Sequence, residues 1–189
     1  RLELLACRFS LLAHWIISQP FSHGDLKPEN IIVKNNGTLA LIDYDGMYVP
    51  TMNGQKTREL GTPNFRHPNR KEFPFDEHID DFALISILLS LKAVSLNPML
   101  LQIYGTNESL LFTDNDYLVI WESSVVASMN SMFYSTTFRN LFSIFLMALT
   151  DGKIPDTLKL YLKFYPKEIN NHISKNINVV HKSLETKTP

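Results

Sequence analysis

One stretch of the sequence can be accommodated only in the interior of a folded domain. Residues 78–94, HIDDFALISILLSLKAV, are apolar on nearly every side of the helix that they would form. A helix without a broad polar face has to be surrounded by other elements, so we expect it to be the buried central helix. The 189 residues are enough for one domain with a sizeable core, or for a large part of a two-lobed domain.

Composition and charge exclude several classes of protein. The net charge of −1 gives no reason to expect a nucleic-acid partner. The single cysteine, Cys7, excludes an intramolecular disulfide and a cysteine-rich zinc site, and it suits a cytoplasmic location. The apolar runs are too short to span a bilayer unaided and no signal peptide is visible, so we expect no membrane association. Because the chain begins with Arg1, we expect it to be a piece of a longer protein.

Local patterns predict the other elements. Residues 1–18 carry apolar side chains at helical spacing, and residues 31–43 alternate around Asn36-Gly37 as a β-hairpin does. Residues 44–78 show no sustained period and predict a long ordered loop, which is uncommon in a compact domain unless it is functional. Further predicted features are helices near residues 94–104, 116–132 and 135–150, a helix cap at Thr113 or Asp114, and a Lys/Asn-rich tail over residues 159–189.

The hairpin brings polar side chains together. If its turn is centred between Asn36 and Gly37, Asn30 lies directly opposite Asp43, with Cβ atoms roughly 4.5–5.5 Å apart. Mg²⁺ takes oxygen ligands and is usually held by one or two side chains together with substrate phosphates, which this amide and carboxylate could supply. Taken singly, such residues are commonly turn or cap residues, but their combination around one hairpin is rare.

The residues before the hairpin add further groups of this kind. Asp25 lies in the preceding loop, where a base could reach a substrate hydroxyl, and Lys27 offers a point charge for a phosphate.

Four motifs resemble those of the protein kinase superfamily. Residues 23–30, HGDLKPEN, resemble the catalytic loop H-R-D-L-K-x-x-N, and residues 42–45, IDYD, resemble the D-F-G metal motif. Residues 61–69, GTPNFRHPN, resemble the G-T-x-x-Y-x-A-P-E segment, and residues 79–85, IDDFALI, resemble the D-x-W-S-x-G start of the central helix. The motifs follow one another in the order typical of the family, over roughly residues 1–150.

The resemblance implies a fold and a chemistry. The implied fold is α+β, mainly α: a protein kinase C-terminal lobe over residues 1–158, a helical bundle with a small β-hairpin at the catalytic loop. The implied cofactors are ATP and Mg²⁺, and the implied partner is a protein substrate bearing Ser or Thr. Asp25 would orient and deprotonate the accepting hydroxyl, Lys27 would hold the γ-phosphate, and Asn30 and Asp43 would bind Mg²⁺.

The chain also departs from the family. Gly24 stands where many kinases have an arginine that reads a phosphorylated loop, so we expect switching without loop phosphorylation, and Thr62 is either a modification site or a plain loop residue. Asp45 replaces the glycine of D-F-G, as a turn residue or a third ligand, and Asn69 replaces the glutamate of A-P-E. Asp80 is the residue that would brace the catalytic loop by resemblance.

A second group of expected features is missing from the chain. It contains no G-x-G-x-x-G loop and no V-A-I-K lysine. We therefore take the N-terminal lobe to be absent from the chain and expect it upstream in the parent protein. The chain alone would then bind ATP weakly and be too incomplete for activity.

Two other functions remain open at this stage. The H-G-D and IDYD patterns also resemble small-molecule phosphotransferases of the aminoglycoside and choline kinase type, although L-K-P-E-N and the G-T-P segment favour a protein kinase. A non-catalytic, pseudokinase-like binding module is the third interpretation, and the joint presence of the four site residues counts against it. Elsewhere, Trp15 and Trp121 are expected in the core, and Cys7 is expected to be buried and inert.

Overall fold

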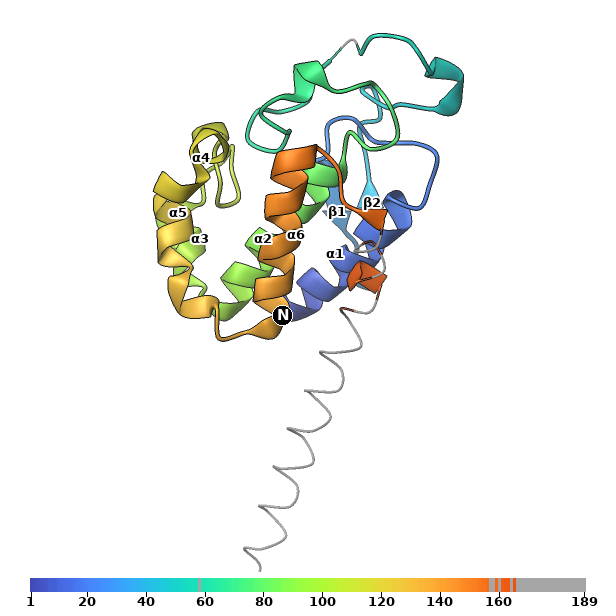
Figure 1. Ribbon diagram of the computed structural model, residues 1–189. Helices are drawn as coiled ribbons and strands as arrows, with labels where there is room; N and C mark the ends of the chain where they lie inside the picture. The colour runs from blue at the N-terminus through green and yellow to red at the C-terminus, as the bar shows by residue number, and fades with distance from the viewer. Residues whose placement is uncertain (58, 157–158, 160, 164, 166–189) are drawn as a thin grey trace, which may run out of the picture.

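The computed structural model describes residues 1–57, 59–156, 159, 161–163 and 165. Its centre is helix α2 (Asp81–Leu96), flanked by α1 (Leu2–Ile16) and α6 (Thr136–Asp151), as Figure 1 shows. Every residue of α2 from Asp81 to Val94 is buried, which confirms the predicted central helix. The described part of the chain is mainly helical with one two-stranded antiparallel sheet, as the predicted α+β class requires.

Helix α1 packs one face against α2 and leaves the other exposed. Its buried positions include Ala6, Phe9, Ala13 and Ile16, which recur every three or four residues. Trp15 falls outside this stripe and is 50% exposed, touching Phe21 with ring centroids 5.7 Å apart. The prediction that Trp15 lies in the core is therefore wrong, because the smaller side chains of α1 occupy the contact with α2.

A buried ion pair joins α1 to α2. The ammonium group of Lys92 lies 2.7 Å from a carboxylate oxygen of Glu3, and Ser95 Oγ donates to the other oxygen over 2.6 Å. Lys92 is the only basic residue of α2, and this partner explains its burial. Cys7 is also buried, and burial is the main cause that raises its pKa to about 11, so the thiol is unreactive as predicted.

The hairpin consists of β1 (Ile31–Val33) and β2 (Leu39–Leu41), with Ile31 facing Leu41. Lys34 N donates to Thr38 O over 2.9 Å, so the loop has three residues instead of the two predicted. Gly37, with φ of +78°, takes the left-handed position that such a loop requires.

The longer loop changes the register, so the predicted pairing of Asn30 with Asp43 is wrong. Asn30 faces Ile42 instead, and Ile42 N donates to Asn30 O over 3.0 Å. Asp43 lies one position further along the chain, in the left-handed region with φ of +66°.

The segment between β2 and α2 confirms the predicted long ordered loop. Among its described residues the helical elements are the short 3₁₀ turns η2 (Pro50–Met52) and η3 (Arg70–Glu72), and the segment forms the upper part of the molecule in Figure 1. A similar turn, η1 (Pro28–Asn30), leads into β1. Mostly polar residues from Thr51 to Arg58 belong to this loop, and Arg58 lies outside the described residues.

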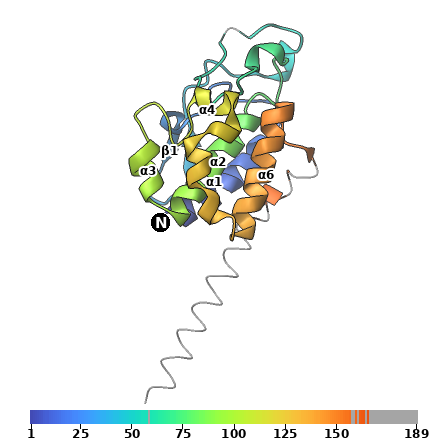
Figure 2. The same cartoon turned by 60° about the vertical axis from the view of Figure 1, so that its left-hand side comes forward.

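Short helices form a layer on one side of α2, as the two views of Figures 1 and 2 show. They are α3 (Met99–Tyr104), α4 (Asp114–Leu118), η4 (Ile120–Glu122), α5 (Ser124–Ser128) and η5 (Asn130–Met132). The predicted helix over residues 116–132 is therefore broken into pieces. Thr113 caps α4 in a capping box with Asp116, as predicted. Trp121, in η4, is 75% exposed, so its predicted place in the core is also wrong.

Two of the predictions concern residues at the end of the described chain. The boundary at residue 158 and most of the predicted tail, residues 166–189, lie outside the described residues. None of the helices in the described part of the chain is long and apolar enough to cross a membrane.

Candidate active site

A buried carboxylate holds the loop before β1 in place. Asp80, immediately before α2, accepts hydrogen bonds from the backbone N–H groups of His23 and Gly24, the latter over 3.0 Å. Asp80 therefore braces this loop, as expected for that residue. His23 adds a second anchor: its Nε2 donates to Ile42 O over 2.8 Å, which ties the loop to the end of β2.

Gly24 occupies a position where no side chain fits. Its φ is +87°, and a Cβ atom built there would lie 1.9 Å from Gly46 O. The loop therefore packs directly against the backbone that follows the IDYD motif. An arginine, which many kinases carry at this point, cannot be accommodated without moving the Gly46 segment.

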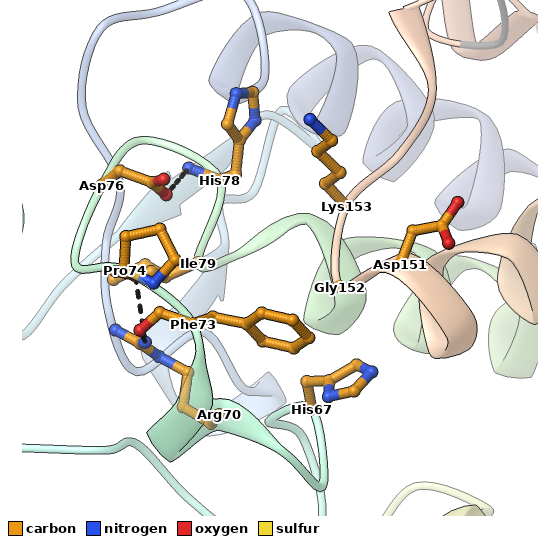
Figure 3. Close-up of a pocket in the computed structure, with 10 residues that line it drawn as sticks. All are labelled: His67, Arg70, Phe73, Pro74, Asp76, His78, Ile79, Asp151, Gly152 and Lys153. Atoms are coloured by element: carbon orange, nitrogen blue, oxygen red, sulfur yellow. Dashed lines mark hydrogen bonds between the residues drawn. The ribbon is translucent and has the colours of Figure 1, made fainter.

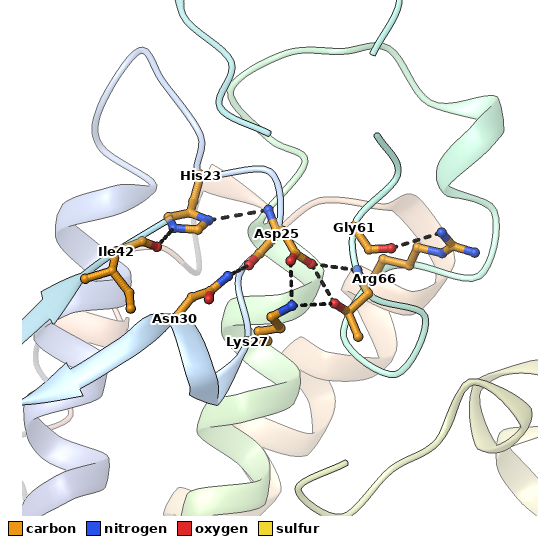
Figure 4. Close-up of polar contacts among 8 residues, drawn as sticks. His23, Asp25, Lys27, Asn30, Ile42, Gly61 and Arg66 are labelled. Atoms are coloured by element: carbon orange, nitrogen blue, oxygen red, sulfur yellow. Dashed lines mark hydrogen bonds and ion pairs between the residues drawn. The ribbon is translucent and has the colours of Figure 1, made fainter. Parts of the chain in front are cut away.

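Asp25 is the centre of a compact polar group (Figure 4). Its Oδ1 accepts hydrogen bonds from Thr62 N over 2.6 Å and from the Thr62 hydroxyl over 2.8 Å. Its Oδ2 lies 2.8 Å from Lys27 Nζ, which also donates to the Thr62 hydroxyl over 3.2 Å. A carboxylate, an ammonium group and an alcohol thus meet within hydrogen-bonding distance of one another.

The electrostatics of this group keep both charged residues ionised at neutral pH. Burial by itself raises the pKa of Asp25, but hydrogen bonds from Lys27 and Thr62 outweigh it and hold the pKa below its usual value. The hydrogen bond to Asp25 raises the pKa of Lys27, and the nearby charges of Glu29 and Asp43 act in the same direction. Asp25 is therefore ionised, and it accepts a hydrogen bond from the hydroxyl group of Thr62.

Asn30 and Asp43 present the oxygen atoms predicted for a magnesium site. The Asn30 side chain is buried, and its Nδ2 donates to Asp25 O over 2.8 Å, which fixes the amide and leaves its oxygen for another partner. Asp43 is exposed, and its charge is felt at Lys27. Among the described residues no cluster of three or more acidic, histidine or cysteine side chains could hold a metal. One amide and one carboxylate nevertheless fit Mg²⁺, which takes its remaining ligands from phosphates and water.

The structure thus joins three of the four predicted site residues directly, namely Asp25, Lys27 and Asn30. Asp43 lies two residues beyond β2 and acts on Lys27 through its charge. The main addition is Thr62, whose place against Asp25 the sequence pattern alone did not predict. Its membership of the GTPNFRHPN segment was the signal that could have found it. Arg66, from the same segment, donates from Nη1 to Gly61 O over 3.0 Å and holds this turn in place.

Comparison with known proteins gives a limited similarity. No protein-family model matches the chain. Serine/threonine-protein kinase TOS3 of Saccharomyces cerevisiae, in strains YJM789 and ATCC 204508 / S288c, is 32% identical over 85 residues. The match covers 37% of this chain and 15% of the yeast protein, so the chain spans a small part of these relatives. Part of the chain is therefore similar to a Ser/Thr kinase.

Proposed function

We propose that this chain is the C-terminal lobe of an ATP- and Mg²⁺-dependent Ser/Thr protein kinase, which transfers the γ-phosphate of ATP to a protein hydroxyl. The observation that carries the proposal is the contact between Asp25 and the Thr62 hydroxyl. This contact supports the proposed role of the carboxylate. Asp25 accepts a hydrogen bond from the Thr62 hydroxyl over 2.8 Å, and Lys27 Nζ lies 3.2 Å from the oxygen of that hydroxyl. A hydroxyl to be phosphorylated needs the same two neighbours.

The roles of the residues follow from their chemistry. Asp25 orients the accepting hydroxyl and takes its proton as the oxygen attacks phosphorus, which is typically worth about 10²–10⁴ in rate. Lys27 places a positive charge beside the transferring phosphoryl group and keeps Asp25 ionised. Thr62 fixes the Asp25 carboxylate through two hydrogen bonds to one oxygen.

Asn30 and Asp43 would hold the magnesium ion, which when bound neutralises charge on the phosphates. Asn30 contributes its amide oxygen, because its nitrogen is already bonded to Asp25 O. Asp43 contributes its exposed carboxylate from the end of the second strand.

The outer face of the hairpin supports a nucleotide ligand. Ile32 lies opposite Ala40, and Ile42 is two residues beyond Ala40, so Ile32 and Ile42 project from the same face of the ribbon. Both side chains are exposed; Ile32 lies two residues after Asn30, and Ile42 directly precedes Asp43. Such a surface suits the flat ring of adenine, with the phosphates directed toward the proposed metal ligands.

The test is transfer of labelled phosphate from ATP by the parent protein, in the length at which its source produces it. We expect Mg²⁺-dependent labelling of Ser or Thr in a protein substrate, lost on Asp25→Asn and on Asp43→Asn. Glu122→Gln is the control, because Glu122 is an exposed carboxylate in η4, outside the candidate site, and is expected to retain transfer. Labelling of an aminoglycoside or choline instead of protein would show the small-molecule alternative to be right. Absence of transfer to either would contradict catalysis.

A further inference from the structure

A second pocket lies apart from the candidate active site. It has a volume of about 180 Å³ and is formed where the η3 turn, the segment before α2 and the turn after α6 meet (Figure 3). None of Asp25, Lys27, Asn30 and Asp43 lines it. A ligand in this pocket would therefore not compete for the proposed catalytic residues.

The shape of the pocket follows from the end of α6. Gly152 ends this helix with φ of +73°, and a Cβ atom at this position would lie 2.6 Å from the Phe73 ring. The turn therefore rests directly on Phe73. It is also anchored by Ile154 N, which donates to the buried Asp81 carboxylate over 2.9 Å. These two contacts place Lys153 at the rim of the pocket.

Three basic side chains line this pocket: Arg70, His78 and Lys153. Arg70 is only 4% exposed, and its Nη1 donates to Phe73 O and Pro74 O over 3.3 and 3.2 Å. Its Nη2 is buried and has no hydrogen-bond partner among the described residues. The carboxylates of Asp76 and Asp80 act on this guanidinium through their charges, but Nη2 still lacks a hydrogen-bond acceptor, and leaving a charged donor buried without one is costly.

The other polar residues of the pocket differ in whether they are free to offset the positive charges of Arg70, His78 and Lys153. Asp76 Oδ1 accepts from His78 N over 2.9 Å, and His78 Nδ1 lies 3.4 Å from a carboxylate oxygen of Asp81, so these two carboxylates already serve His78. Figure 3 shows the carboxylate of Asp151 directed away from Phe73 and His67. His67 is also satisfied: its Nε2 donates to Leu149 O over 2.8 Å and its Nδ1 accepts from Asn69 N over 3.0 Å.

We propose that this pocket binds a small organic oxyanion, a phosphate or carboxylate carried on a short apolar body. The charged head lies between Arg70, His78 and Lys153, and the apolar body lies against Phe73 and Ile79. The volume is below the roughly 300–1,000 Å³ of pockets for drug-sized ligands, so the body is no larger than a single ring. This site goes beyond the proposed kinase function and does not depend on it.

The test is an NMR titration of the full chain with phenyl phosphate, benzoate and phenol, followed through backbone amide signals. We expect saturable shifts at Gly152, Lys153 and His78 with at least one of the two anions, and none with phenol, which has the ring without the anionic head. Comparing phenyl phosphate with benzoate identifies the head group. Failure of both anions would overturn the proposal, as would equal binding of phenol.

Two matched variants locate the binding. Lys153→Met removes an exposed basic group that lines the pocket, and we expect it to weaken binding about tenfold or more, the usual effect of losing one charge-assisted hydrogen bond. Lys71→Met removes an exposed charge on the neighbouring η3 turn and is expected to leave affinity unchanged. Shifts confined to Asp25 and Thr62, or unchanged affinity in Lys153→Met, would contradict the proposed location. Neither result would bear on phosphate transfer at Asp25.

Discussion

The hydroxyl of Thr62 donates to the carboxylate of Asp25 over 2.8 Å, although 37 residues of sequence separate them. The backbone N–H of Thr62 donates to the same oxygen over 2.6 Å. One residue of the long loop therefore positions the proposed base and also contributes to its ionisation.

Replacing Thr62 should raise the pKa of Asp25. Thr62→Val removes the hydroxyl hydrogen bond that favours the ionised carboxylate, whereas burial, which opposes ionisation, remains. Thr62→Ser keeps the hydroxyl and serves as the control. The measurement is a ¹³C NMR titration of the Asp25 carboxyl carbon in the three proteins. Equal pKa values in the valine and serine variants would show that the Thr62 hydroxyl does not contribute to the ionisation of Asp25.

The close approach at Gly24 predicts an unequal pair of glycine substitutions. Gly24 and Gly54 have φ of +87° and +80°, but a Cβ at Gly24 would lie 1.9 Å from Gly46 O, while a Cβ at Gly54 meets nothing within 4 Å. We expect Gly54→Ala to lower the free energy of unfolding by about 1–2 kcal/mol, the cost of the left-handed conformation. Gly24→Ala should cost a further ~1–3 kcal/mol from overpacking. Urea unfolding checks this, and equal costs would mean that the Gly46 segment moves aside freely.

The buried ion pair predicts an asymmetry between its two partners. The side chain of Lys92 is 8% exposed and that of Glu3 is 32% exposed. Glu3→Gln leaves a buried ammonium without a counter-charge and should cost about 3 kcal/mol of unfolding free energy. Lys92→Met leaves a carboxylate that still accepts from Ser95 and reaches solvent, and it should cost about 1 kcal/mol. The double variant should resemble Lys92→Met in urea unfolding. The reverse order would contradict this assignment.

His67 predicts a loss of stability on acidification. Burial lowers its pKa below the ordinary value near 6.5, so in acid the unfolded chain binds a proton that the folded protein resists. The stability contributed by neutral His67 is complete above about pH 6.5 and is lost as the pH falls toward its lowered pKa. His67→Gln cannot ionise and should show a smaller decline in unfolding free energy between about pH 7 and 5.

His78 acts in the opposite direction, from about pH 6.5 upward, and is present in both proteins. Its hydrogen bond to Asp81 raises its pKa, so its contribution is complete below about pH 6.5 and is lost as the pH rises through the raised pKa. Comparing wild type with His67→Gln at each pH therefore isolates His67. Parallel stability curves for the two proteins would contradict the role assigned to its neutral ring.

Much of the helical framework could be predicted from sequence because it depends on local patterns. The central helix was predicted from its uniform apolarity, and the cap at Thr113 from the residues that follow it. Prediction was poorer where the burial of a side chain depends on which other element packs against it. Trp15 and Trp121 sit in or near helical turns, yet both are half or more exposed, because no element in the described part of the chain covers that side of them.

The candidate site shows the same division. The residue types and order of the HGDLKPEN and IDYD motifs indicated an acid, a lysine and two candidate oxygen ligands. The pairing of Asn30 with Asp43 was predicted incorrectly, because the Gly37 turn contains three loop residues and an odd loop shifts the register by one.

The sequence by itself determined the helical framework, the hairpin and the set of groups around it, because each depends on residues close together in the chain. Only the tertiary structure decided that Thr62 lies against Asp25, that Asp80 lies beneath Gly24, and that a pocket opens beside Arg70. These contacts join segments dozens of residues apart. They form because the buried central helix fixes the paths of the loops that meet above it.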